Sequence, residues 1–340
     1  PPPEPGVQPP GGTAVPDRDG RPVRKVVAQA SPNLALVKYW GKASVEENLP
    51  ATPSIGITLK DLSSEVSVAE SAVGDRVVVD GEIQEISRFR PFLDALRARG
   101  STRSSFSVEG TNSFPGGSGL ASSASGFAAA AKAGLRLLDL DDGERAVSSL
   151  ARIGSASAAR SAYGGICRLE REAEYAEPLY DETWWPELLL LVAVVARGKK
   201  PVSTRVAMER SRQTSPYYGA WVETAPEIAR RAADAIARRD LDGLGTAMQQ
   251  SYLGMFGTMF TSVPPVFYWL PESVAILRLC ASLREAGIPA WETMDAGPQV
   301  KILTTEEHGR KIRDALEGLQ MTDRVLETRQ GGPPRILREG

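Results

Sequence analysis

Between residues 24 and 112, hydrophobic and polar positions alternate with the two-residue period of half-buried strands. This period predicts three strands, over 24–31, 64–71 and 104–112. Asp80-Gly81 predicts a tight hairpin turn within 75–82. Over 86–100 the apolar residues recur at helical spacing instead, which predicts an amphipathic helix that ends at Gly100. The first third of the chain is therefore expected to be mainly strands, with one helix packed against them.

The rest of the chain mixes long helical patterns with short apolar runs. Helices are expected over 123–140, 142–155, 226–255, 273–287 and 307–319. Strands are expected over 188–196, over both ends of 290–304, and over 324–329. Early strands with helices on one side, followed by a second mixed half, predict an α+β fold with antiparallel sheets.

The two ends of the chain differ from its body in composition. Residues 1–22 are dominated by Pro, Gly and Asp and predict a disordered Pro/Gly-rich extension. Residues 330–340 look similar and are expected to be a flexible tail. The body is expected to form two domains, over 23–186 and 187–329.

Composition and charge narrow the class of protein. A formal net charge of −2 gives no reason to expect a nucleic-acid partner. The longest apolar run, 188–196, is too short to cross a bilayer, which takes about 20 residues. A single histidine, His308, and two distant cysteines, Cys167 and Cys280, argue against a zinc site or a Ser-His-Asp triad. A cytoplasmic protein with no membrane partner is expected.

The uncharged segment 114–126, FPGGSGLASSASG, holds four Gly and four Ser in thirteen positions. Such a composition is typical of flexible linkers. The segment joins a predicted strand to the Ala-rich helix, however, and glycine-rich loops that open a helix bind phosphate through converging N–H groups and the helix dipole. The pattern is neither the Walker A nor the Rossmann fingerprint. From the loop alone, a phosphate cradle and a tight connection selected for packing both remain open.

Two further stretches hold candidate charged groups. In VKYWGK, Lys38 and Lys42 either end a strand with their stems along apolar surface or contact an anion, which the adjacent glycine favours for Lys42. In MDAGPQ, Asp295 either hydrogen-bonds its own turn or acts as a base, since a chain with one histidine has mainly carboxylates for that role.

The stretch GSASAAR is the best candidate for a substrate phosphate. Ser155 and Ser157 can present two hydroxyls to one anion, and Arg160 can add a charge-assisted pair. An ordinary helix end with Arg160 on the surface explains the same residues, and the stretch alone does not decide between the two.

Four motifs follow one another along the chain: ASPNLALVKYWGK (30–42), PGGSGLASSA (115–124), RIGSASAARSAYGG (152–165) and TMDAGPQVKIL (293–303). The second resembles the ATP-phosphate loop of the GHMP kinase superfamily. Together they resemble the signature segments of one family within it, the mevalonate diphosphate decarboxylases. The resemblance implies a GHMP kinase-like two-domain fold with the active-site cleft between the domains. It also implies ATP-dependent decarboxylation of mevalonate 5-diphosphate to isopentenyl diphosphate.

The same resemblance implies roles for individual residues. Asp295 is expected beside the tertiary hydroxyl of the substrate, as a base or positioning carboxylate, with Lys42 and Arg160 offsetting anionic charge. The implied substrate contacts are Tyr39, Lys42, Ser155, Ser157, Arg160, Arg76 and Ser203. The implied ATP contacts are Asn112, Gly116, Gly117, Ser118, Gly119, Leu120, Ser122 and Ser123. Mg2+ is the implied metal, with Ser123 as its ligand, and a homodimer is the implied assembly.

Some of these assignments have alternatives. Arg76 is equally well explained as an ordinary charge beside the hairpin. Gly56, in TPSIGITL, replaces a serine that the family commonly has, so one hydroxyl is expected to be missing. The sequence leaves open a decarboxylase or 3-kinase of mevalonate 5-phosphate, and a related small-molecule kinase. A catalytically silent sensor is disfavoured, because Ser155, Arg160 and Asp295 are all present.

Overall fold

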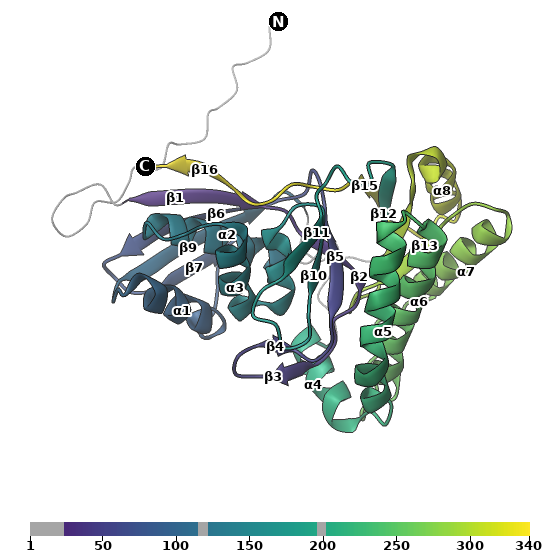
Figure 1. Cartoon of the computed structure of the whole chain (residues 1–340), viewed down its shortest axis with the longest axis horizontal. Coiled ribbons are helices and arrows are strands. Elements are labelled where there is room, and N and C mark those ends of the chain that lie inside the picture. The colour runs from purple at the N-terminus through teal and green to yellow at the C-terminus, as the bar shows by residue number, and fades with distance from the viewer. Residues whose placement is uncertain (1–23, 115–121, 196–201) are drawn as a thin grey trace, which may run out of the picture.

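The structure, a computed structural model, describes residues 24–114, 122–195 and 202–340. Its elements form two halves that lie side by side (Figure 1). A six-stranded sheet in the N-terminal half has the order β16-β1-β6-β9-β7-β8 and is antiparallel except for the β7–β9 pair. Its strands are β1 (Lys25–Ala30), β6 (Ser64–Ser71), β7 (Arg76–Val79), β8 (Glu82–Ile83), β9 (Ser105–Asn112) and β16 (Arg335–Glu339).

Three helices pack on one face of this sheet, α1 (Arg90–Gly100), α2 (Ser122–Leu137) and α3 (Glu144–Gly154), and the short turn η1 (Ile86–Arg88) precedes α1 (Figure 1). The face of α2 toward the sheet consists largely of small side chains, including the fully buried Ala128 and Ala131. Small side chains let the helix axis approach the strands closely, so the Ala-rich pattern that predicts this helix also explains its position.

A second sheet lies between this layer and the C-terminal half (Figure 1). Its order is β11-β10-β5-β2, with strands β2 (Asn33–Val37), β5 (Ser54–Thr58), β10 (Ile166–Leu169) and β11 (Glu177–Tyr180). The turn η2 (Ala156–Ala162) packs against it, and a small hairpin, β3 (Lys42–Ser44) with β4 (Leu49–Pro50), extends from its edge.

The C-terminal half combines one sheet with five helices. The sheet has the order β13-β14-β12-β15, with strands β12 (Leu188–Val194), β13 (Trp291–Met294), β14 (Val300–Thr305) and β15 (Arg324–Thr328). The helices are α4 (Thr204–Thr214), α5 (Tyr218–Ala237), α6 (Leu241–Phe260), α7 (Pro271–Glu285) and α8 (Glu306–Gly318).

The two halves share a hydrophobic core. Leu36 of β2 and Ile57 of β5 lie in one buried cluster with Ile228 of α5 and Met248 of α6. Full burial of such a side chain contributes about 1.5–3 kcal/mol. Residues that follow β2 are therefore held rigidly against the C-terminal helices.

Several predicted elements are confirmed nearly residue by residue. Strands β1, β6 and β9 lie within a residue of the predicted ranges. The hairpin turn is present at Asp80-Gly81, where both residues have positive φ, +50° and +81°. Positive φ at two consecutive residues is what a type I′ hairpin turn needs, and Asp-Gly meets that need at low cost.

Other elements were missed or misplaced. Strands β2 and β5 are buried along their whole length, so they show none of the alternation on which strand prediction depends. The long helix predicted over 226–255 is two helices, and it begins earlier, at Tyr218. Arg239 has φ +53°, which ends α5, and the side chain of Asp240 then accepts a hydrogen bond from the Gly243 N–H and caps α6.

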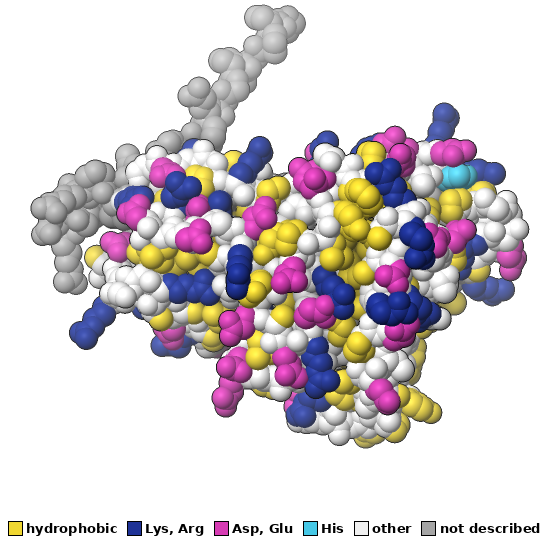
Figure 2. Space-filling view, in the orientation of Figure 1, with side chains coloured by type: hydrophobic (Ala, Val, Ile, Leu, Met, Phe, Trp, Pro, Cys, Tyr) yellow, Lys and Arg dark blue, Asp and Glu magenta, His cyan; other side chains and the backbone are white. Residues whose placement is uncertain are grey.

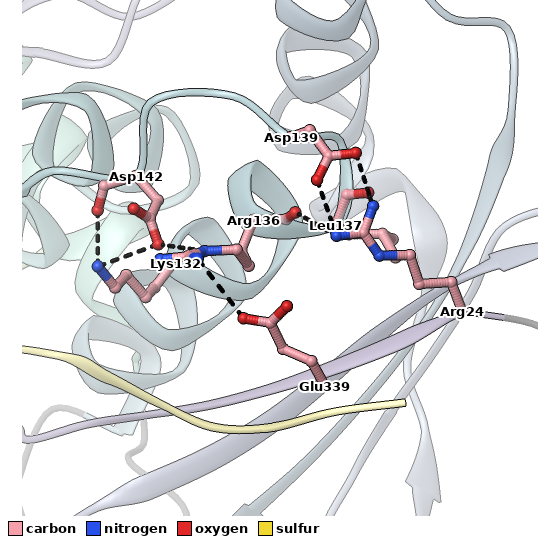
Figure 3. Close-up of polar contacts among 7 residues, drawn as sticks. All are labelled: Arg24, Lys132, Arg136, Leu137, Asp139, Asp142 and Glu339. Carbon is pink, nitrogen blue, oxygen red and sulfur yellow. Dashed lines mark hydrogen bonds and ion pairs between the residues drawn. The ribbon is translucent and has the colours of Figure 1, made fainter.

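The prediction of a flexible C-terminal tail is wrong. Residues 335–339 form β16, which pairs antiparallel with β1, with Val26 opposite Glu339. Without it β1 would be an edge strand with unpaired N–H and C=O groups. Figure 3 shows Glu339 of β16 next to Arg136 of α2, at 3.6 Å, and Arg24 paired with Asp139 at 2.7 Å. The strand has only five residues, too few for a convincing pattern in the sequence.

Surface charge follows the composition. Figure 2 shows basic and acidic side chains interspersed over both halves on the face that it draws. In the described parts of the chain, no helix is both long and apolar enough to cross a membrane.

Candidate active site

Asp295 lies at the junction of the two halves, between β13 and β14. One carboxylate oxygen, Oδ1, is 2.8 Å from the Nζ of Lys38, and the other, Oδ2, is 3.1 Å from the Nζ of Lys301. Both lysines are 1% exposed, whereas the Asp295 side chain keeps 33% of its surface. The carboxylate is thus ion-paired with two buried lysines, and part of its surface remains exposed to solvent.

The two lysines come from different parts of the chain. Lys38 directly follows β2, where its N–H donates to the Ser251 hydroxyl of α6 at 2.7 Å and its Nζ also donates to the Ala35 carbonyl. Lys301 is the second residue of β14 and lies opposite Thr293 of β13 in the sheet. The pairing of Asp295 with Lys38 therefore depends on the contact between the two halves.

Burial and charge act in opposite directions on these groups. Burial alone would raise the pKa of Asp295, but Lys301 and Lys38 outweigh it and hold that pKa well below its ordinary value. Burial lowers the pKa of Lys38 to about 8, with Lys301 and Arg160 contributing and Asp295 opposing. Asp295 is therefore ionised at neutral pH, and Lys38 loses its proton under mildly alkaline conditions.

Arg160, in η2, is the next cation in this group. Its Nε donates to the Asn33 side chain at 3.1 Å, and Nη1 donates to the Ser54 hydroxyl at 2.6 Å. Burial lowers its pKa, and the negative charge of Asp295 opposes that shift, which places the two groups in one electrostatic neighbourhood. Arg160 is not the surface charge of an ordinary helix end, because it is only 2% exposed.

Arg160 leaves no room for a side chain at residue 56. A Cβ at residue 56 would lie 2.6 Å from the Nε and 2.9 Å from the Cδ of Arg160. Asn33 and Ser54 fix the guanidinium, so it has little freedom to move away. The serine hydroxyl expected from the resemblance is absent here, and its space is used by the arginine.

Ser155 and Ser157 lie together at the start of η2, with their hydroxyls 3.0 Å apart. Asn33, which holds Arg160, also donates to the Ser157 carbonyl at 2.9 Å. Both serines are partly exposed, while Arg160 behind them is buried. Two neighbouring hydroxyls and a nearby guanidinium form a suitable anion site.

Lys42 of the β3 hairpin and Arg205 of α4 form a second pair of cations. Burial lowers the pKa of Lys42, and the positive charge of Arg205 on α4 lowers it further, whereas Glu209 raises it. Burial raises the pKa of Tyr39, against the positive fields of Arg160 and Arg205. Tyr39 therefore links the Arg160 group with the Lys42 group. The lysine in contact with Asp295 is Lys38, not Lys42.

The predicted nucleotide residues lie elsewhere in the N-terminal half. Asn112, Ser122 and Ser123 line one pocket between β7, β9, η1 and the first turn of α2, together with Val79 and Phe92. The side-chain amide of Asn112 donates to Asp80 at 2.8 Å, and its oxygen accepts from Ser64 at 2.6 Å. Asn112 is thus firmly positioned in the pocket wall. The predicted contacts Gly116, Gly117, Ser118, Gly119 and Leu120 lie outside the described residues.

Two other predicted substrate contacts have partners of their own. Arg76, at the start of β7, pairs with Glu109 of β9 at 3.2 Å, and both side chains are about half exposed. This is the ordinary hairpin-side charge that the sequence left open. Ser203 is the N-cap of α4, where its hydroxyl accepts a hydrogen bond from the Val206 N–H.

Sequence reasoning missed Lys301 and Arg205 and undervalued Lys38. A usable signal was present, because Lys38 and Lys301 each interrupt an apolar run, LALVKYW and QVKIL. Lysines are almost never fully buried unless they are paired, so a lysine inside a buried strand pattern indicates a nearby carboxylate.

The described residues contain no cluster of three or more His, Cys, Asp and Glu side chains that could hold a metal ion. Mg2+ commonly keeps several waters and binds through substrate phosphates plus one or two protein oxygens. The hydroxyl of Ser123, at the first turn of α2, is a donor of the right kind. The residues therefore fit a metal that arrives with a nucleotide.

Two mixed α+β halves, with a Gly/Ser-rich segment that leads into a pocket-lining helix, define an enzyme of the GHMP kinase type. Within that class the chain belongs to the diphosphomevalonate decarboxylase family. The model of the diphosphomevalonate decarboxylase-like N-terminal domain matches residues 30–179, and that of the mevalonate 5-diphosphate decarboxylase C-terminal domain matches residues 190–334.

Individual relatives agree with this membership. The chain is 30% identical to the diphosphomevalonate decarboxylase of Debaryomyces hansenii, over 84% of this chain and 80% of the relative. It is 33% identical to a crystal structure of mevalonate diphosphate decarboxylase from Staphylococcus aureus, with a TM-score of 0.86 over 93% and 98% of the two chains. It is 32% identical to the structure of MDDEF in complex with MVAPP, AMPPCP and magnesium, with a TM-score of 0.87 over 93% and 99%.

Proposed function

We propose that this protein converts mevalonate 5-diphosphate and ATP into isopentenyl diphosphate, CO2, ADP and phosphate, with Mg2+ accompanying the nucleotide. The observation that carries the proposal is Asp295, a partly exposed carboxylate held between Lys38 and Lys301. It is the group suited to orienting a hydroxyl for phosphorylation. The similarity to relatives with this activity supports the same conclusion.

The diphosphate of the substrate is assigned to the Ser155 and Ser157 hydroxyls in front of Arg160. Lys42 and Arg205 supply further positive charge toward the outer end of the same region, with Tyr39 between. Arg160 is anchored before the substrate arrives, because Asn33 and Ser54 already hold its guanidinium. Preorganised donors lose little entropy when an anion binds.

ATP is assigned to the pocket that Asn112, Ser122 and Ser123 line. The first turn of α2 offers free N–H groups and the positive end of the helix dipole to the phosphates. Ser123 is the proposed protein ligand of Mg2+, which supplies charge neutralisation on the phosphates. The pocket wall formed by Val79 and Phe92 is apolar, as a nucleobase requires.

The proposed chemistry has two steps. The tertiary hydroxyl oxygen, oriented by Asp295, bonds to the γ-phosphorus while the bond between that phosphorus and ADP breaks. The C–O bond to the new phosphate then breaks, the carboxylate leaves as CO2, and its bonding electrons form the double bond. The proton of the hydroxyl passes to an oxygen of the transferred phosphoryl group as the new O–P bond forms, and it leaves with the phosphate in the second step, so each step balances. Arg160 and Lys38, which are already in position, stabilise the negative charge on the transferred and departing phosphate.

Cytoplasmic location and a homodimer are also proposed. Two cysteines, Cys167 and Cys280, are free and buried, which is typical of proteins from a reducing compartment and supports the first proposal. Light scattering of the purified protein at micromolar concentration tests the dimer.

Parallel measurements of ADP and CO2, with mevalonate 5-phosphate and mevalonate 5-diphosphate as substrates, test the proposed reaction. Equal amounts of ADP and CO2 are expected with the diphosphate, and much less of either with the monophosphate. ADP without CO2 would show that the enzyme is a 3-kinase. Turnover of mevalonate 5-phosphate alone would show that the diphosphate is not its substrate. The silent-sensor alternative requires neither product with either substrate.

A further inference from the structure

Lys301 is a buried cation whose ammonium group contacts the carboxylate at the centre of the site. It is 1% exposed, lies within β14, and has its Nζ 3.1 Å from Asp295 Oδ2. A charged side chain in a central part of a sheet costs several kcal/mol unless it is paired. An apolar residue would suit this position of the strand better, so a reason for the lysine is needed.

The geometry supplies that reason. Lys38 alone binds one oxygen of Asp295, and a carboxylate held by a single oxygen can still rotate about χ2. Lys301 binds the other oxygen from the opposite half of the junction, so both ends of the carboxylate are fixed. Each oxygen keeps a lone pair that its lysine does not use, and 33% of the side chain is exposed, so the carboxylate can still accept a hydrogen bond.

We infer that Lys301 is a positioning residue for phosphorylation of the substrate: together with Lys38 it fixes the carboxylate plane of Asp295 so that its free lone pair meets the hydroxyl. The inference rests on the proposed function for the identity of that hydroxyl. It assigns Lys301 no contact with substrate or nucleotide. Its effect is on the chemical step and not on binding.

The charges around Lys38 mean that a change at Lys301 should alter the pH dependence of kcat/KM. The groups that act on Lys38 are Asp295, Lys301 and Arg160; burial and the two cations lower its pKa to about 8, and Asp295 opposes them. Activity that needs charged Lys38 falls as the pH rises through that value. Removal of the positive charge of Lys301 takes away one of the groups that lower the pKa of Lys38. The alkaline fall in kcat/KM therefore moves to higher pH.

The test compares Lys301→Met and Lys301→Arg with the wild type in the full-length protein. Lys311→Met, at an exposed position of α8, is the matched control for loss of one lysine charge. For Lys301→Met, kcat for ADP formation is expected to fall about 10- to 100-fold, because small misplacements of a reacting group have effects of that size. KM for both substrates stays within about threefold, and the alkaline limb of kcat/KM moves up by about half a pH unit.

Lys301→Arg keeps the positive charge. It is expected to recover most of kcat and to show the alkaline limb of kcat/KM at the wild-type pH. If Lys301→Met does not fold, Lys301→Gln is measured in its place, since its amide can still donate to Asp295. A kcat within about twofold of the wild type, an unmoved alkaline limb, or a loss confined to KM would overturn the inference.

The two proposals fail in different ways. If the wild type forms ADP but releases no CO2, the decarboxylase proposal fails, while the effect of Lys301 is still read from ADP. If ADP and CO2 form together but Lys301→Met behaves like Lys311→Met, only the inference about Lys301 fails.

Discussion

The protein presents two regions suited to anions, and they are built in different ways. The pocket beside α2 uses mainly neutral groups, including the hydroxyls of Ser122 and Ser123 and the N-terminal turn of a helix, with Arg88 as the charged residue of its described lining. The junction around Asp295 uses full charges, and its three innermost cations, Lys38, Lys301 and Arg160, are 1–2% exposed. The residues that line the pocket come from one part of the chain, 64–130, whereas the junction gathers residues from 33 to 301.

The difference fits the roles proposed for the two regions. Dipoles and hydroxyls bind phosphates without strong desolvation, so they suit a nucleotide that enters and leaves in each cycle. Buried charges are costly to assemble but need no reorganisation when charge develops during a reaction. Charges at the junction therefore suit the chemical step, and dipoles in the pocket suit nucleotide binding.

Asp295→Asn is expected to have the largest effect on turnover of the variants considered. Turnover is expected to fall about 1000-fold, since the variant loses the carboxylate that orients the hydroxyl. Nucleotide affinity, measured by calorimetry, should stay within about threefold of the wild type. The two lysines also lose their counter-charge, so the free energy of unfolding should fall by about 3 kcal/mol. Asp314→Asn on the surface of α8 is the control, and near-normal turnover of Asp295→Asn would contradict the assigned role.

Gly56→Ala tests whether the charges must be fixed in advance. The added Cβ would lie 2.6 Å from the Nε of Arg160, so the guanidinium has to shift. KM for the diphosphate substrate is expected to rise about 10- to 100-fold with KM for ATP unchanged. Gly257→Ala is the matched control, because its Cβ meets nothing within 4 Å. Unchanged KM in Gly56→Ala would show that Arg160 does not hold the substrate.

Ser122→Ala combined with Ser123→Ala probes the neutral region. Loss of hydroxyl contacts worth about 1 kcal/mol in total should raise KM for ATP about fivefold, while KM for the diphosphate substrate stays constant. Ser87→Ala, at an exposed position of η1, serves as the control. A larger effect on the diphosphate substrate than on ATP would mean that the two regions have been assigned the wrong way round.

Removal of residues 335–340 should have the smallest effect on catalysis. The strand β16 touches neither region, but it covers the edge of β1. The free energy of unfolding is expected to fall by about 1–3 kcal/mol from the lost backbone hydrogen bonds, with kcat and KM unchanged. Glu339→Gln, which removes only an exposed ion pair, should cost under about 1 kcal/mol. Denaturant unfolding measures both, and a loss of activity on truncation would imply a link from β16 to the site.

Much of this architecture was predictable from local pattern. Alternation located β1, β6 and β9, helical spacing located α1 and α3, and Asp80-Gly81 located the hairpin. Those elements have one face in the core and one in water, which is the condition under which a pattern is visible. Strands β2 and β5 are buried on both faces and were missed for that reason.

The candidate site divides along the same line. Asp295, Arg160, Ser155 and Ser157 were found because each lies in a short motif whose residue types suit anions or proton transfer. The sequence by itself determined which chemical groups the protein carries and most of the elements that hold them. It did not determine that Lys38 meets Asp295, because the two residues are 257 positions apart and meet only when β2 packs against the C-terminal half. Only the tertiary structure decided that pairing, since the energy that brings buried Lys38 to the carboxylate comes from packing across the two halves, whereas Lys301 is placed by the local pairing of β13 with β14.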